Sequence, residues 1–270
     1  MTTFQRTHEW GALTRAEIAE ARDAGALAIL TLGSCEQHGD HLPVNTDTLS
    51  AFQVTLAAAE RCTAVHALVL PPPSFGFSPH HQAWPGTVTL RLPTFLAMVD
   101  DIAESVFRAG FDRLLIVNGH GGNAGPLTSL CTELVSRGRR VAWVSYFAPG
   151  YAEWSKHMKG QKPGVGHACE YETAMQLALR PDDRQQIAGR IAGLPARLGA
   201  AYVEDEGNPF KDTGAVYAAL FAAGDPGYSG DPGVSTLETG EALLESTVAG
   251  LARFLPVFAA AKLKVGGTPA

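Results

Sequence analysis

Short apolar runs alternate with helical stretches over the first half of the chain, and this alternation constrains the fold more than any other feature. The run from Leu27 to Leu32 is nearly continuous and ends at Gly33, as a buried parallel strand does. A helix is expected from Thr46 to about Cys62, because these residues are rich in Ala and Leu and include no Gly or Pro.

The alternation then repeats, with strands expected at 67–70, 113–117 and 141–145 and helices at 94–109 and 124–137. Helices of this length between strands require crossover connections, which produce a parallel sheet covered by helices on both faces. We therefore predict an α/β fold that is layered, with a mostly parallel central sheet flanked by helices.

The remaining third of the sequence is less regular. A helix is expected at 170–179, a loop-rich stretch at 200–233 and a long closing helix at 236–261. We find no internal repeat and no convincing linker. Residues 1–270 are therefore expected to form a single α/β domain.

Composition and charge narrow the possible partners. The net charge is −6 and no long Lys/Arg cluster occurs, which argues against nucleic acid as a partner and favours a small molecule. The N-terminus lacks a signal-peptide pattern, and no apolar stretch approaches the ~18 residues of a membrane span. The four cysteines are scattered without CxxC spacing, as in a reduced compartment. We predict a cytoplasmic protein with no membrane partner.

Three distant segments concentrate metal-binding side chain types around glycine: 36–47, 118–123 and 167–172. Glu36 and His120 fall just past the C-terminal ends of two expected strands, where open parallel sheets bind ligands. The fold can therefore bring the three segments to one edge and assemble a dinuclear metal site.

The first segment offers Glu36, His38 and Asp47. In extended chain, Glu36 and His38 project to the same side and could hold one metal or two adjacent metals. Asp47 lies at a helix start, where the helix dipole favours an ionised carboxylate that can bridge two cations. The alternative is that all three are ordinary polar residues of a loop and a helix start.

The second segment places His120 between glycines. The glycines could form a packing turn, or Gly119, Gly121 and Gly122 could bind an anion at the start of the following helix. Neither GxGxxG nor GxxxxGK[ST] is present, so we favour His120 as a metal ligand.

The third segment contains His167, Glu170 and Glu172. If Glu170 opens a helix, it shares a face with Thr173 while Glu172 points elsewhere, so one glutamate serves the site and the other the scaffold. Imidazoles and carboxylates without a thiolate pattern suit a hard or borderline ion such as zinc or manganese.

Together these residues resemble the creatininase family of metal-dependent amidohydrolases. Residues 36–48, 118–123 and 167–173 match its three signatures in order, and the likeness extends over about 25–250. The resemblance implies a creatininase-like layered fold, a homohexamer and two divalent metal ions per chain that share a carboxylate, with zinc or manganese as the metal.

The resemblance also implies roles for single residues. Glu36, Asp47 and His120 would hold one ion, and His38 and Asp47 the other, with Glu170 supplying the last oxygen. Creatinine-hydrolysing members carry a glutamate at the position of Gly122, so creatinine itself is not expected as the substrate. His167 resembles the proton-transfer histidine, a task suited to a pKa near ~6.5, and Glu170 is the second residue expected to act in catalysis.

The expected function is therefore a dinuclear metal-dependent hydrolase that cleaves a small C–N amide, cyclic amides included. Within the family, the alternatives are a formamide hydrolase, a peptide-trimming hydrolase and a cyclitol ring hydrolase. Outside it, the protein could bind an anion with the 119–122 loop, or hold metal only to brace its fold. His80 and His81 could reach the site; three aromatic residues could line a substrate pocket or pack in the core, namely Trp84, Tyr151 and Trp154.

Overall fold

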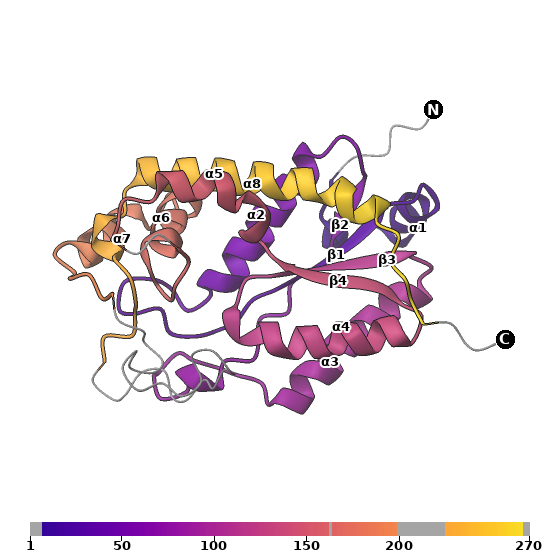
Figure 1. Ribbon diagram of the computed structural model, residues 1–270, viewed down its shortest axis with the longest axis horizontal. Coiled ribbons are helices and arrows are strands. Elements are labelled where there is room, and N and C mark those ends of the chain that lie inside the picture. The colour runs from indigo at the N-terminus through magenta and orange to yellow at the C-terminus, as the bar shows by residue number, and fades with distance from the viewer. Residues whose placement is uncertain (1–6, 162–163, 199–224, 267–270) are drawn as a thin grey trace.

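Four parallel strands form the central sheet of the protein (Figure 1). The computed structural model describes residues 7–161, 164–198 and 225–266. Within them the strand order is β2-β1-β3-β4, and all three pairings are parallel. The strands are β1 (Leu27–Leu32), β2 (Ala67–Val69), β3 (Arg113–Asn118) and β4 (Arg140–Ser145). The expected parallel sheet is confirmed.

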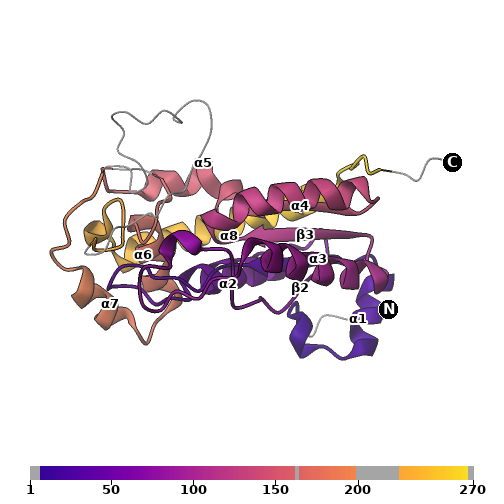
Figure 2. The same ribbon diagram turned by 90° about the horizontal axis from the view of Figure 1, so that it is seen from below.

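Helices cover both faces of this sheet (Figures 1 and 2). One face carries α2 (Thr46–Arg61), α5 (Tyr151–Trp154), α6 (Glu170–Leu179) and α8 (Leu237–Ala260). The other carries α1 (Arg15–Asp23), α3 (Leu92–Arg108) and α4 (Ala124–Ser136). A further helix, α7 (Arg184–Ile191), packs on α6 at the end of the molecule away from α1.

Each face of the sheet has its own apolar core, because successive strand residues point to opposite sides. Ile29 of β1 lies in one core with Val54 of α2 and Leu251 of α8. Its neighbour Leu30 lies in the other core with Phe95 of α3. Strands that are buried on both faces read as continuous apolar runs, which is why the sequence located them.

Three helices were not anticipated from the sequence, namely α1, α5 and α7. Helix α1 begins with a capping box: Thr14 Oγ1 accepts from the backbone N–H of Glu17, and Glu17 Oε2 accepts from the N–H of Thr14. Helix α7 buries only Ile187 and Ile191, so its apolar pattern is weak. The loop-rich stretch expected at 200–233 falls mostly outside the described residues.

The closing helix α8 is long and apolar enough to cross a membrane by length and composition, and an 18-residue window within it has a mean hydropathy of 1.4. The sequence expectation that no apolar stretch reaches this length is therefore wrong. However, 44% of the apolar window is buried inside the protein, and α8 packs against α2 and α6. A buried core helix meets the same criteria, so α8 is weak support for a membrane span.

The sheet topology opens a crevice beyond β1 and β3. These strands are neighbours, but β1 is followed by α2 on one face and β3 by α4 on the other. Connections that diverge in this way leave room beyond the carboxyl ends of the two strands. Glu36, in the segment after β1, and His120, in the segment after β3, both lie at this crevice.

Candidate metal centre

A cavity of about 150 Å³ occupies the crevice. Its lining combines carboxylates and imidazoles from all three sequence segments with several glycines. The acidic and imidazole side chains around it are Glu36, Asp47, His80, His81, His120, His167 and Glu172. The structure thus brings together parts of the chain that are more than a hundred residues apart.

The first group of candidate ligands is Glu36, Asp47 and His120. His120 Nδ1 lies 3.2 Å from Glu36 Oε1 and 3.1 Å from Asp47 Oδ2. His120 Nε2 donates to the carbonyl oxygen of Phe77 at 3.1 Å, because a carbonyl can only accept. In the neutral ring the lone pair is therefore on Nδ1, which faces the carboxylates, as a metal ligand requires.

The second group is His38, Asp47 and Glu172. His38 Nε2 lies 3.0 Å from Asp47 Oδ1 and 3.8 Å from Glu172 Oε2. Its Nδ1 donates to the carbonyl of Glu36 at 3.1 Å, so in the neutral ring Nε2 is free to coordinate. The two oxygens of Asp47 face different groups, which is the arrangement of a bridging carboxylate.

Glu170 is not brought into either group. Its two carboxylate oxygens accept from the backbone N–H groups of Lys159 at 2.6 Å and Gly160 at 2.9 Å. The carboxylate that reaches the cavity belongs to Glu172, although the sequence predicts Glu170 for this role. Just before α6 the backbone of Ala168 is left-handed (φ 47°), and its N–H donates to Glu172 Oε2 at 2.5 Å.

His167 lies beside these groups at the cavity wall. Its Nδ1 is 3.5 Å from Glu36 Oε1, and its Nε2 is 2.7 Å from the carbonyl oxygen of Gln37. The ring is buried, and burial lowers the pKa of His167 well below its ordinary value. It therefore presents a neutral imidazole to the cavity.

The buried carboxylates fit a cationic occupant. Glu36 Oε2 is buried and has no hydrogen-bond partner within the described part of the chain, and the buried Asp47 Oδ2 faces His120 Nδ1 at 3.1 Å. No lysine or arginine of that part forms an ion pair with Glu36, Asp47 or Glu172. Burying uncompensated carboxylates is costly, whereas a divalent ion held by oxygen and imidazole nitrogen would offset that cost.

Without a metal, protons take the place of the cation. Burial alone would lower the pKa of His38, but the charge and hydrogen bond of Asp47 outweigh it and raise the pKa to about 10. Burial raises the pKa of Glu172 to about 8. Burial also opposes ionisation of Asp47, yet His38 and His120 hold its pKa well below the usual range. In the metal-free site, Asp47 is thus the ionised carboxylate, and the imidazoles of His38 and His120 beside it supply the positive charge.

Two glycines of the second segment allow this close assembly. A Cβ on Gly119 would lie 2.5 Å from the carbonyl oxygen of Asp47, so only glycine lets the first turn of α2 approach β3 this closely. A Cβ on Gly122 would overlap His120 Nε2 and lie 2.6 Å from His80 Cε1. The backbone and the two imidazoles thus leave no space for a side chain at residue 122.

The 119–122 loop is poorly suited to an anion. The N–H of Gly119 donates to the carbonyl of Leu32 at 2.7 Å, and that of Asn123 donates to the carbonyl of His120 at 3.2 Å. The carboxylates of the cavity would also repel a negative ligand. The anion-binding alternative is therefore disfavoured by charge and by the hydrogen bond that occupies the N–H of Gly119.

Of the aromatic residues considered for a pocket, Trp154 is buried in the core and donates to the carbonyl of Phe147 at 2.7 Å. Tyr151 is 54% exposed. Among the described residues, Phe147 is the aromatic side chain that lines the cavity, and nothing in the sequence singled it out. Trp84 is not among the lining residues, whereas His80 and His81 reach the cavity as expected.

Buried carboxylates and imidazoles at the open edge of a parallel sheet define the class of protein as an α/β metal hydrolase. A family model described as "Creatininase: Creatinine amidohydrolase" matches residues 11–255. The chain belongs to the creatininase family and is a hydrolase that acts on C–N bonds.

Relatives and solved structures agree with this assignment. The chain is 30% identical over 260 residues to a mycofactocin precursor peptide peptidase from Mycobacterium tuberculosis, covering 91% of this chain and 92% of the relative. A solved structure described as "Creatininase Mn" superposes with a TM-score of 0.72 at 26% identity, covering 93% of this chain and 98% of the other. A creatininase variant described as "Zn-Zn type" gives a TM-score of 0.70 at 27% identity, with the same coverage.

Proposed function

We propose that the protein binds two divalent ions, zinc or manganese, and hydrolyses an amide C–N bond. Glu36, Asp47 and His120 would hold one ion, and His38, Asp47 and Glu172 the other. The observation that carries this proposal is Asp47, whose two buried oxygens face the two imidazoles from opposite groups. Glu172 takes the role that was expected of Glu170, because it is Glu172 that reaches the cavity.

Two bound ions would lower the pKa of a water molecule and polarise the substrate carbonyl. The chain's own residues would then orient the reactants and move protons. His167 faces the cavity with Nδ1, so this nitrogen could take a proton from the water and pass it to the leaving nitrogen. Its hydrogen bond to the backbone of Gln37 holds the ring in place.

The substrate that we propose is the amide of a small molecule or of the end of a short peptide. A cavity of about 150 Å³ holds a small group rather than a folded chain. The likeness to a peptide peptidase over most of both chains supports the peptide alternative. The absence of space for a glutamate at Gly122 argues against creatinine.

The proposal is tested by metal analysis and a substrate screen of the same samples. The protein, loaded with zinc or manganese, would be assayed with formamides, lactams, cyclic ureas, creatinine and short peptides. We expect about two ions per chain, hydrolysis of at least one amide and little turnover of creatinine. Asp47→Ala should lose both ions and all activity.

Retention of metal and hydrolysis in Asp47→Ala would contradict the proposal. Rapid turnover of creatinine would contradict the part that rests on Gly122. Metal binding that raises stability without any hydrolysis would favour a bracing role for the ions.

We also propose that the protein assembles as a homohexamer and works in the cytoplasm. The hexamer rests on the family resemblance. The four cysteines, Cys35, Cys62, Cys131 and Cys169, are all free thiols, which supports a reducing compartment. Light scattering would measure the mass of the assembly, and a monomeric mass would contradict it.

A further inference from the structure

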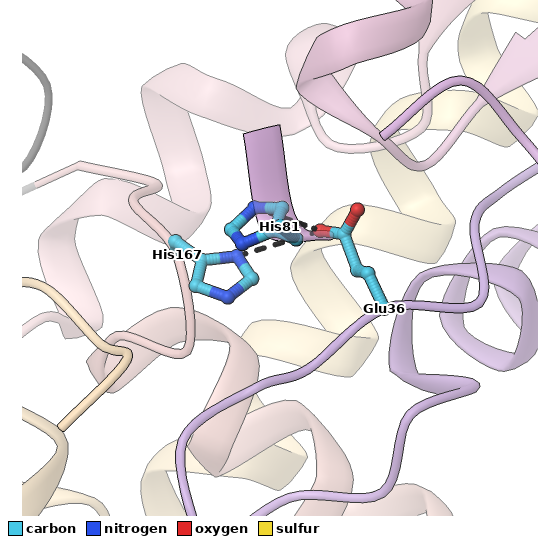
Figure 3. Close-up of side chains that lie close together, drawn as sticks. All are labelled: Glu36, His81 and His167. Atoms are coloured by element: carbon cyan, nitrogen blue, oxygen red, sulfur yellow. Dashed lines mark ion pairs between the residues drawn. The ribbon is translucent and has the colours of Figure 1, made fainter. Parts of the chain in front are cut away.

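Two stacked histidines face the same carboxylate at the cavity wall (Figure 3). The ring centroids of His81 and His167 lie 4.1 Å apart with an interplanar angle of 27°. His81 Nε2 and His167 Nδ1 are each 3.5 Å from Glu36 Oε1. The three residues could be read as a further metal site, because their ligand atoms lie close enough to surround an ion.

The side chain of Gln37 decides which nitrogen of His81 carries hydrogen. Gln37 Oε1 accepts from the backbone N–H of Gly39 at 2.8 Å, which fixes the orientation of the amide. Its Nε2 is therefore the donor, and it lies 3.0 Å from His81 Nδ1. Since Nδ1 accepts this bond, the hydrogen of neutral His81 is on Nε2, the atom that points toward Glu36.

The backbone of Gln37 leads His167 to present an acceptor nitrogen to the cavity, whereas His81 presents a donor. Its carbonyl oxygen lies 2.7 Å from His167 Nε2, and a carbonyl can only accept, so this nitrogen carries the hydrogen. His167 Nδ1 then presents a lone pair to the cavity. Gln37 Nε2 also lies 3.0 Å from His167 Nε2, but both atoms bear hydrogen, so this contact is not a hydrogen bond.

We propose that Gln37 is a positioning residue that makes His81 the fixed N–H donor of the cavity and His167 its fixed acceptor. The donor of His81 would hold the carbonyl oxygen of the substrate, while His167 handles the proton. This assignment of substrate contacts rests on the proposed hydrolase function. It also excludes a further metal ion between His81 and His167, because an N–H nitrogen cannot ligate.

The tautomers can be measured directly, without a substrate. Protein labelled with ¹⁵N-histidine would be sedimented, zinc-loaded or chelator-treated, and studied by magic-angle-spinning NMR, which separates bare from hydrogen-bearing ring nitrogens. Signals are assigned by their loss in His81→Asn and His167→Asn. We expect hydrogen on Nε2 and a bare Nδ1 in both histidines.

Gln37→Glu is the decisive variant, because it keeps the bond to Gly39 and replaces the donor to His81 by an acceptor. His81 Nδ1 should then gain a hydrogen. His167 should not change, since a backbone carbonyl holds it. Gln53→Glu on the exposed face of α2 adds the same charge and serves as the control. A His81 Nδ1 that bears hydrogen in the unchanged protein, or stays bare in Gln37→Glu, would overturn the proposal.

A second arm follows activity once a substrate is known. His81→Leu should lower kcat about 100-fold, as loss of a donor to a developing oxyanion does, with the metal content unchanged. His81→Gln, which can still donate, should recover part of this loss. Loss of a metal ion in His81→Leu would show instead that His81 is a ligand. Because the NMR arm needs no turnover, its failure is separable from failure of the hydrolase proposal.

Discussion

At the scale of residues, the site depends on which carboxylates face inward. Asp47 lies in the first turn of α2 and faces two imidazoles; the sequence could place a carboxylate at a helix start, while its bridging role stays a prediction. In the third segment, position on the helix did not predict which glutamate faces the cavity. Glu170 and Glu172 differ by two positions, and the structure places Glu172 at the cavity, after a left-handed turn at Ala168 that no sequence pattern indicated.

The two glutamates can be separated by matched substitutions. Glu172→Gln should reduce the metal content from about two ions to about one, because it removes an anionic ligand from one group only. Glu170→Gln should leave the metal content unchanged, since its carboxylate accepts from the backbone N–H groups of Lys159 and Gly160. Metal analysis of the two purified variants decides between them. Loss of an ion in Glu170→Gln alone would restore the sequence-based assignment.

At the scale of elements, the separation of α2 and α6 sets the separation of Asp47 and Glu172. One turn beyond these carboxylates, the amide of Gln176 donates to Ser50 at 2.8 Å and ties the two helices together. Helix α8 packs on α6, with Gly240 facing the carbonyl of Ala174. Helices were expected from the sequence at 46–62, 170–179 and 236–261, where α2, α6 and α8 lie, but these contacts join residues too distant for a local pattern to reveal.

The contact between α6 and α8 can be tested at Gly240. A Cβ on Gly240 would overlap the carbonyl oxygen of Ala174, so Gly240→Ala should destabilise the protein by about 1–3 kcal/mol. Gly189 in α7 is exposed, and a Cβ added there would have no other atom within 4 Å, so Gly189→Ala should stabilise by up to about 1 kcal/mol. Urea unfolding measures both. Equal effects of the two substitutions would contradict the close packing.

At the scale of the whole molecule, the parallel sheet was predictable because its strands read as apolar runs separated by helices, but the strand order was not predicted. Glu36 and His120 were expected just past two strand ends, and the pairing of β1 with β3 brings these ends together. The hydrogen bond between Gln37 and His81 could not be expected from the sheet, because a loop after β2 carries His81 to the site. Loop paths of this kind depend on packing throughout the fold rather than on local propensity.

The charge of the site should make the stability of the metal-free protein depend on pH. The folded pKa of His38 is about 10 against an ordinary 6.5, and that of Glu172 is about 8 against 4.5. Both groups therefore keep protons in the folded state that the unfolded chain releases. The free energy of unfolding should fall as pH rises from 6.5 toward 9, since the folded state binds more protons.

Urea unfolding at pH 6.5, 8 and 9 measures this dependence in chelator-treated protein. Zinc-loaded protein is the control, and its stability should fall less, because bound ions replace the protons. A free energy of unfolding that rises with pH in the chelator-treated protein would show that the buried site is not protonated as described.

The most direct measurement is anomalous X-ray diffraction from crystals of the zinc-loaded protein. We predict two anomalous peaks on either side of Asp47, one beside Glu36 and His120 and the other beside His38 and Glu172. No peak at Asp47, or a single peak held by Glu170, would contradict the central claim that this carboxylate bridges a pair of ions.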